Sequence, residues 1–180
     1  MNIGQKIFSY ALLAFLGFLT IKIILGADFI FVHYIDLIFH EAGHMIFMFF
    51  GEFIQFLGGT MMQLLVPIIC GITFLRQKDY FAATIMLWWL GENLWDVSIY
   101  ISDARAQALQ LIGGEHDWHY LLGELNLLTY DGHIGMVVYG VGVTMMISAL
   151  VLGVVAIQKT ESKEESEEKE KFENYLAKNE

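Results

Sequence analysis

The sequence has very little of two residues that shape many soluble proteins: one cysteine, Cys70, and one proline, Pro67, in 180 residues. A single cysteine excludes an intramolecular disulfide and cannot complete a cysteine-rich metal site. Basic residues are also few, because 10 Lys and Arg stand against 20 Asp and Glu, which gives a formal net charge of −10. This balance, with no basic patch, argues against a nucleic acid as partner. The sequence also contains no glycine-rich phosphate loop and no internal repeat.

Apolar residues, in contrast, make up 56% of the chain, and the mean hydropathy is +0.54. This is too apolar for an ordinary soluble domain. Five apolar stretches, at about 7–25, 29–50, 57–75, 80–101 and 133–157, each approach the roughly 20 residues that cross a bilayer core. We therefore predict an all-α, polytopic membrane protein, surrounded by lipid, with about five spans in a single helical membrane domain over residues 1–157. The oligomeric state does not follow from the sequence.

The last segment, residues 158–180, is a charged tail: "QKTESKEESEEKEKFENYLAKNE". It is acid-heavy and too poor in apolar residues to pack a core, so we expect a solvated helix or a disordered segment. Its lysines fall on the same membrane side as Arg76 and Lys78 if 80–101 and 133–157 both cross. The positive-inside rule makes that side cytoplasmic. Three earlier spans would then place the N-terminus outside, which conflicts with Lys6.

The stretch "FHEAGHMIF", residues 39–47, carries two histidines and a glutamate among apolar neighbours. His40 and His44 lie one turn apart on one helical face, where two imidazoles can bind one metal ion. Glu41 can then act as general base toward a water activated by zinc. By chance the three-residue pattern would arise in roughly one such chain in a hundred, but burying these groups in a membrane without a role costs several kcal/mol. We predict that His40 and His44 bind zinc and that Glu41 is catalytic.

Two more polar residues, His33 and Asp36, precede His40 by seven and four positions on the same helical face. A carboxylate behind a metal-bound histidine fixes its tautomer and orientation, so Asp36 could orient His40. Alternatively, both residues mark the membrane interface where the helix begins.

An acidic stripe runs through the fourth apolar stretch, where four polar residues recur at helical spacing: Glu92, Asp96, Tyr100 and Asp103. The stripe could line a water-filled pocket beside the metal, supply a ligand, or pair with Arg105. Asp103 and Arg105 equally fit the interfacial end of the helix, whereas Glu92 and Asp96 lie too deep for that explanation.

After Gly113 and Gly114 the chain reads "EHDWHYLLGELNLL", which predicts a short amphipathic helix that lies at the interface or is re-entrant. One face carries Trp118, Leu121, Leu122 and Leu125, and the other carries His116 and His119.

This segment also offers a third ligand, because zinc bound by two histidines needs one more protein ligand and an open position for water. We expect His116 or Asp117 to supply it, with His119 as a further donor in the segment. Asp117 also fits a helix N-cap.

The entry to the last stretch, "NLLTYDGHIG", contains Asn126, Asp131 and Gly132. Together with "HEAGH" in a membrane segment, this pattern resembles the site-2 protease family of intramembrane zinc metalloproteases. The resemblance implies that Glu41 is the base, that His40 and His44 bind zinc, and that Asp131 is the third ligand. The residues themselves favour His116 or Asp117, so the third ligand stays open.

Three functions compete. The first is a zinc-dependent peptidase that cleaves a peptide bond within or beside the membrane, with Glu41 as base. The second is a hydrolase of a lipid or other amphiphile, because the same chemistry serves any ester or amide that reaches the pocket. The third is a non-catalytic metal-binding or transport protein in which Glu92 and Asp96 form an ion path; a base beside the ligands argues against it. Iron, cobalt or manganese would also suit two imidazoles and a carboxylate.

Overall fold

The computed structural model describes residues 3–27, 30–109 and 116–177, and every element in these ranges is helical. This confirms the predicted all-α fold. In chain order the elements are α1 (Ile3–Ile24), α2 (His33–Phe47), the 3₁₀ turn η1 (Met48–Phe50), α3 (Glu52–Arg76), α4 (Tyr80–Asp103), α5 (Asp117–Glu124), the 3₁₀ turn η2 (Leu128–Tyr130) and α6 (Asp131–Ala177).

Three helical segments in the described part of the chain are long and apolar enough to cross a membrane: Ile3–Ile24, Glu52–Arg76 and Leu128–Ser162. Membrane association is therefore supported, but the expected five spans are not confirmed. The 24-residue α4 is not among the three because Glu92, Asn93 and Asp96 lie in it. The 15-residue α2 covers only about 22 Å at 1.5 Å per residue.

The predicted second stretch, 29–50, is shortened because its helix ends early. Phe47 is the last α-helical residue, η1 follows, and Gly51 then turns the chain with a φ of 95°. Glycine adopts this left-handed conformation without steric penalty. As a result α2 doubles back onto α3, which begins at Glu52.

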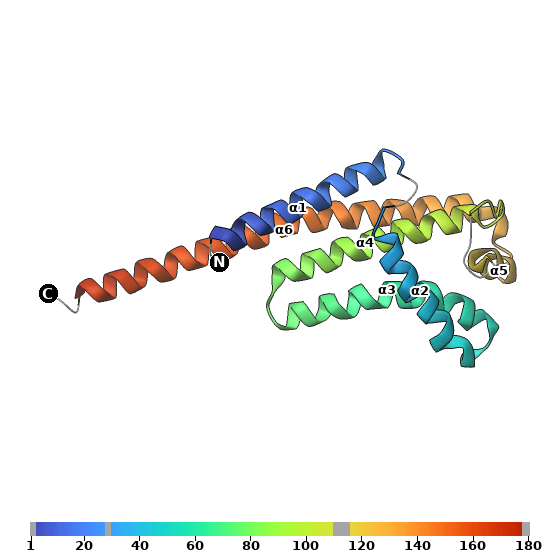
Figure 1. Cartoon of the computed structure of the whole chain (residues 1–180), viewed down its shortest axis with the longest axis horizontal. Helices are drawn as coiled ribbons and strands as arrows, with labels where there is room; N and C mark the ends of the chain where they lie inside the picture. The colour runs from blue at the N-terminus through green and yellow to red at the C-terminus, as the bar shows by residue number, and fades with distance from the viewer. Residues whose placement is uncertain (1–2, 28–29, 110–115, 178–180) are drawn as a thin grey trace.

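Figure 1 shows how the helices are arranged: α3 and α4 form an antiparallel hairpin, α4 packs along α6, and α1 lies against α6. Glycines let α4 and α6 approach to backbone distance, since a Cβ on Gly91 would lie 2.7 Å from the carbonyl oxygen of Gly142. Buried Trp88, Trp95 and Met146 fill the core beside this contact. The shorter α2 crosses α3 obliquely, away from this core.

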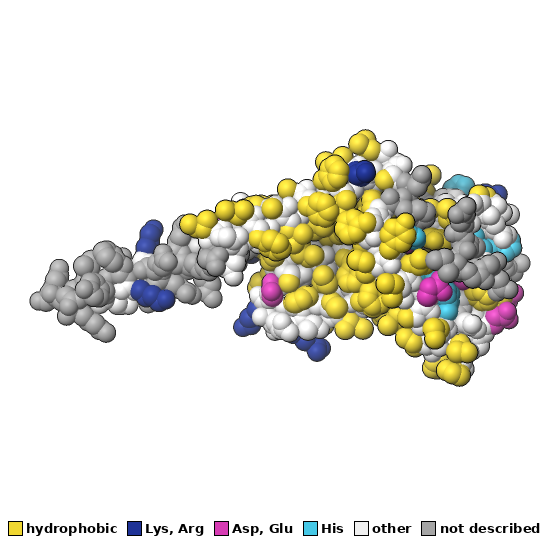
Figure 2. Space-filling model, viewed as in Figure 1, with side chains coloured by type: hydrophobic (Ala, Val, Ile, Leu, Met, Phe, Trp, Pro, Cys, Tyr) yellow, Lys and Arg dark blue, Asp and Glu magenta, His cyan; other side chains and the backbone are white. Residues whose placement is uncertain are grey.

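The two ends of the bundle differ in charge. Lys6 pairs with Glu161 at 3.5 Å, and Lys78 and Lys159 line one cavity, so these three lysines define one end, which we call the lysine end. Figure 2 shows several basic side chains at the α3–α4 turn and on the tail, a mainly apolar middle with one basic side chain, and His and acidic side chains with one basic group at the opposite end. Residues 158–177 of the tail continue α6 as the same helix, which projects beyond the bundle (Figure 1).

Candidate metal site

Where α2 crosses α3, both histidine rings lie against a glycine of α3, which has no side chain. A Cβ on Gly43 would overlap the carbonyl oxygen of Gly58, so the two backbones are in direct contact. One position further along α3, a Cβ on Gly59 would lie 2.7 Å from His40 Nε2 and 2.8 Å from His44 Cε1. The two rings therefore rest on Gly59, and any larger residue there would displace them.

The short helix α5 brings a carboxylate to both rings. Asp117 Oδ2 lies 2.8 Å from His40 Nε2 and 3.2 Å from His44 Nε2. One ligand atom from each of the three residues lies within 4.8 Å of the others, so the group could hold a metal ion. The side chains of His40, His44 and Asp117 keep 18%, 20% and 15% of their surface exposed. All three side chains are therefore mostly, but not completely, buried.

The hydrogen bonds behind the rings settle which nitrogen faces the site. His44 Nδ1 lies 2.8 Å from the backbone carbonyl oxygen of Gln55, which can only accept, so Nδ1 carries the proton. His40 Nδ1 lies 3.2 Å from Gln63 Oε1. The orientation of that amide is set by its other end, because Gln63 Nε2 donates to Asp96 Oδ2 at 2.8 Å. Both Nδ1 atoms are thus donors.

A neutral imidazole that is protonated on Nδ1 presents a lone pair at Nε2. Here two such lone pairs would face one carboxylate oxygen, Asp117 Oδ2, at hydrogen-bond distance. Additional protons on the rings relieve the repulsion in the absence of metal, and a divalent cation that displaces them would relieve it equally well. The donor set therefore fits a metal ion.

The protonation of Asp117 agrees with a ligand role. Burial alone raises the pKa of this carboxyl group, but hydrogen bonds from His40 and His44 outweigh burial and hold the pKa below its usual range. Asp117 is therefore ionised at neutral pH, which is the form that binds a metal.

The predicted base, Glu41, follows His40 in α2 and is half-buried. Its carboxylate is close enough to interact electrostatically with His44 and Tyr100, and it is not part of the three-residue group. The Tyr100 ring lies with its centroid 6.5 Å from that of His40, nearly parallel to it. A carboxylate that no ligand position uses is thus available beside the histidines.

A polar chain of three residues supports His40 from behind. Asp96 accepts the Gln63 amide through Oδ2 and lies 2.8 Å from His33 Nδ1 through Oδ1. Gln63 therefore connects Asp96 of the acidic stripe to His40. The sequence did not identify Gln63 as part of the site. The only signal was one glutamine in an apolar run, "TMMQLLV".

Asp36, which was expected to orient His40, has a different partner. Its Oδ1 accepts the indole N–H of Trp89 at 2.7 Å, and the residue is completely buried. Glu92, which is also completely buried, lies close enough to Asp36 for the two carboxyl groups to interact electrostatically. The hydrogen bond from Trp89 to Asp36 ties α2 to α4.

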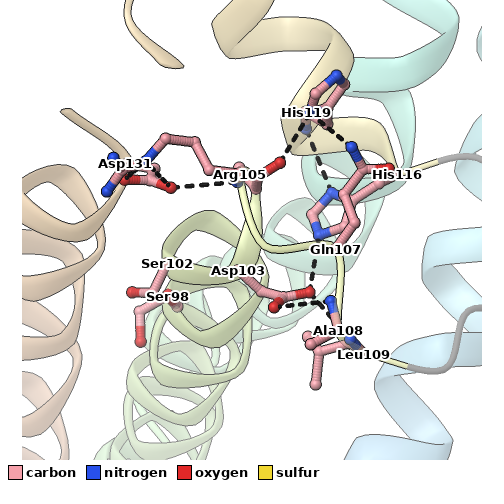
Figure 3. A network of polar contacts seen from close by, with 11 residues as sticks. Ser98, Ser102, Asp103, Arg105, Gln107, Ala108, Leu109, His116, His119 and Asp131 are labelled. Atoms are coloured by element: carbon pink, nitrogen blue, oxygen red, sulfur yellow. Dashed lines mark hydrogen bonds and ion pairs between the residues drawn. The ribbon is translucent and has the colours of Figure 1, made fainter. Parts of the chain in front are cut away.

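His116 and His119 hold α5 in place rather than joining the three-residue group (Figure 3). His116 is the N-cap of α5: its Nδ1 accepts the backbone N–H of His119 at 3.2 Å, and its Nε2 lies 3.4 Å from Asp103 Oδ2. His119 Nδ1 lies 2.8 Å from the carbonyl oxygen of Ala104. Because His116 provides the cap, Asp117 occupies the first helical position and turns to His40 and His44. The predicted break at Gly113 and Gly114 lies outside the described residues.

Asp131, the third ligand that the family resemblance implies, is bound by Arg105 (Figure 3). The Arg105 Nε donates to Oδ1 at 2.8 Å and to Oδ2 at 2.9 Å, and the backbone N–H groups of Arg105 and Gly132 add two more hydrogen bonds. The side chain is almost fully buried by these contacts. Asp131 therefore joins the turn after α4 to the start of α6 and lies outside the His40–His44–Asp117 group.

Comparison with protein-family models, with curated proteins and with solved structures found no match to this chain.

Proposed function

We propose that this protein is a membrane-embedded metallohydrolase, in the first instance a zinc peptidase acting on a bond held within or beside the membrane. One observation supports this most: two imidazoles with fixed Nδ1 protons converge on one ionised carboxylate, and Glu41 stands beside them outside the ligand set. Three protein ligands with an open fourth position are typical of catalytic zinc sites.

In this proposal each residue has a separate task. His40, His44 and Asp117 hold the ion, and Gln63 and the carbonyl of Gln55 keep the rings oriented. When bound, zinc would lower the pKa of a coordinated water toward neutrality and polarise the scissile carbonyl. Glu41 takes a proton on its carboxylate from the attacking water and returns it to the leaving nitrogen.

The decisive assay uses purified full-length protein in proteoliposomes with two substrates, a transmembrane peptide and a phospholipid. We expect peptide cleavage that stops when a chelator removes the metal and returns when zinc is added, because the ion supplies the activated water. Lipid hydrolysis with the same dependence would select the amphiphile hydrolase instead. Hydrolysis that continues after complete metal removal would contradict both.

A non-catalytic ion carrier remains the second candidate because of one observation. Asp36 and Glu92 form a completely buried carboxyl pair apart from the metal group, and buried carboxyl groups in membrane helices often mark ion pathways. Metal-dependent uptake into the proteoliposomes without hydrolysis of either substrate would favour this function.

For the membrane arrangement we propose that α4 crosses together with α1, α3 and α6, with its polar residues shielded by its neighbours, and that α2 and α5 enter only part of the way. The N-terminus, the α3–α4 turn and the tail then share one side. The positive-inside rule makes this lysine end cytoplasmic, which removes the conflict with Lys6.

This arrangement predicts opposite labelling of two single cysteines placed in a Cys70→Ser background. With an impermeant thiol reagent on intact cells, Gln107→Cys should react, whereas Lys78→Cys should react only after permeabilisation. Equal reactivity of both positions before permeabilisation would show that they share a side, and the proposed orientation would be wrong.

A further inference from the structure

A cavity of about 1020 Å³ lies at the lysine end, between the α3–α4 hairpin and α6. Its walls are apolar and include Pro67 from α3, Leu87 and Leu90 from α4, and Leu152 from α6. Two lysines, Lys78 and Lys159, complete its lining. None of its lining residues belongs to the metal group or to the polar chain behind it.

Both lysines are exposed, and neither forms an ion pair with another residue in the described part of the chain. The acidic neighbour of Lys78 is already engaged, because Asp79 caps α4 by accepting the backbone N–H of Ala82 at 3.0 Å. Three and four residues after Lys159 the helix carries Ser162 and Lys163, so the local sequence offers no carboxylate at pairing distance. The mouth of the cavity is therefore cationic.

The depth of the cavity matches one leaflet of a bilayer. Tyr80 and Leu90 both line it and are 10 positions apart in α4, which corresponds to about 15 Å along the helix. This is half of the roughly 30 Å hydrocarbon core. With the lysines at headgroup level, the apolar walls lie where acyl chains run.

We propose that this cavity binds one anionic phospholipid, with its phosphate between Lys78 and Lys159 and an acyl chain against the walls from Pro67 to Leu90. Cationic pockets between membrane helices on the cytoplasmic side suit such headgroups. A zwitterionic lipid brings its own cation to the same place and gains less from the two ammonium groups. The inference depends on the membrane location of the bundle and is independent of the metal site and its activity.

The test compares phosphatidylglycerol with phosphatidylcholine of identical chains, added to the full-length protein in detergent, by native mass spectrometry. We expect one phosphatidylglycerol to be retained per chain, about 25-fold more tightly than phosphatidylcholine, since a lysine near the headgroups contributes about fivefold. The double variant Lys78→Gln and Lys159→Gln should lose this preference. Lys22→Gln, which removes a lysine in the last turn of α1, is the matched control and should keep it.

A second variant tests the apolar walls without changing charge. Ala156→Phe fills the cavity from α6 and should weaken retention of phosphatidylglycerol at least about 10-fold, while glycerol phosphate alone should not compete. Equal retention of both lipids by the unmodified protein, full competition by glycerol phosphate, or a change of oligomeric state in Ala156→Phe would each overturn the proposal. The last outcome would show that a second copy of the chain covers the cavity.

Discussion

His40→Ala and His44→Ala are each expected to reduce the metal content of the purified protein from about one ion per chain to nearly none. Each change deletes one of the two proposed imidazole ligands. One imidazole and one carboxylate bind an ion too weakly to retain it during purification. Elemental analysis of the purified variants measures this directly. Metal retained in either variant would show that the two histidines are not a joint site.

The same measurement decides the third ligand. Asp117→Ala should empty the site, because Asp117 Oδ2 is the atom to which both rings point. His116→Ala should weaken metal affinity about 10-fold, since His116 only caps α5 and thereby positions Asp117. Asp131→Ala should leave the metal content unchanged. If only Asp131→Ala empties the site, the ligand set implied by the site-2 protease resemblance is the right one.

Glu41→Gln is expected to lower hydrolysis by about 10²–10⁴-fold, the usual contribution of a positioned acid–base group, while the protein keeps one ion per chain. Glutamine preserves the shape of the side chain but cannot accept the proton of the attacking water. The assay is metal-dependent cleavage in proteoliposomes, with elemental analysis of the same preparation.

Glu52→Gln serves as the control for this experiment, because Glu52 is an exposed carboxylate in the first turn of α3. It should retain full activity. Loss of metal in Glu41→Gln would make Glu41 a ligand, and unchanged cleavage would remove its role as base.

The sequence was sufficient for features that depend on local spacing. Hydropathy predicted an all-helical membrane protein, and the four-residue step from His40 to His44 placed both rings on one face. The number of spans did not follow, because a single turn at Gly51 shortens α2 and buried polar residues lower the hydropathy of the continuous helix α4.

Which residue of α5 lies beside His40 and His44 could not be read from the sequence, because it depends on one position at the start of the helix. His116 and Asp117 are adjacent and both suit zinc, but the N-cap residue turns to Asp103 and the next residue turns to the two histidines. The hydrogen-bond partners of the two imidazole Nδ1 atoms could not be predicted from the sequence either. The hydrogen bond to the backbone carbonyl of Gln55 does not depend on a residue type that a sequence could reveal. Gln63 contacts His40 only because α3 packs on α2.

The residues of the candidate metal site are widely separated along the chain, and Asp117 follows His40 by 77 positions. A ribosome therefore finishes α2, α3 and α4 before it begins α5. Until that moment the nascent chain offers two histidines without their carboxylate. In the proposed function, metal uptake therefore has to await the synthesis of α5, and a chain that stops after α4 lacks the carboxylate of the proposed site.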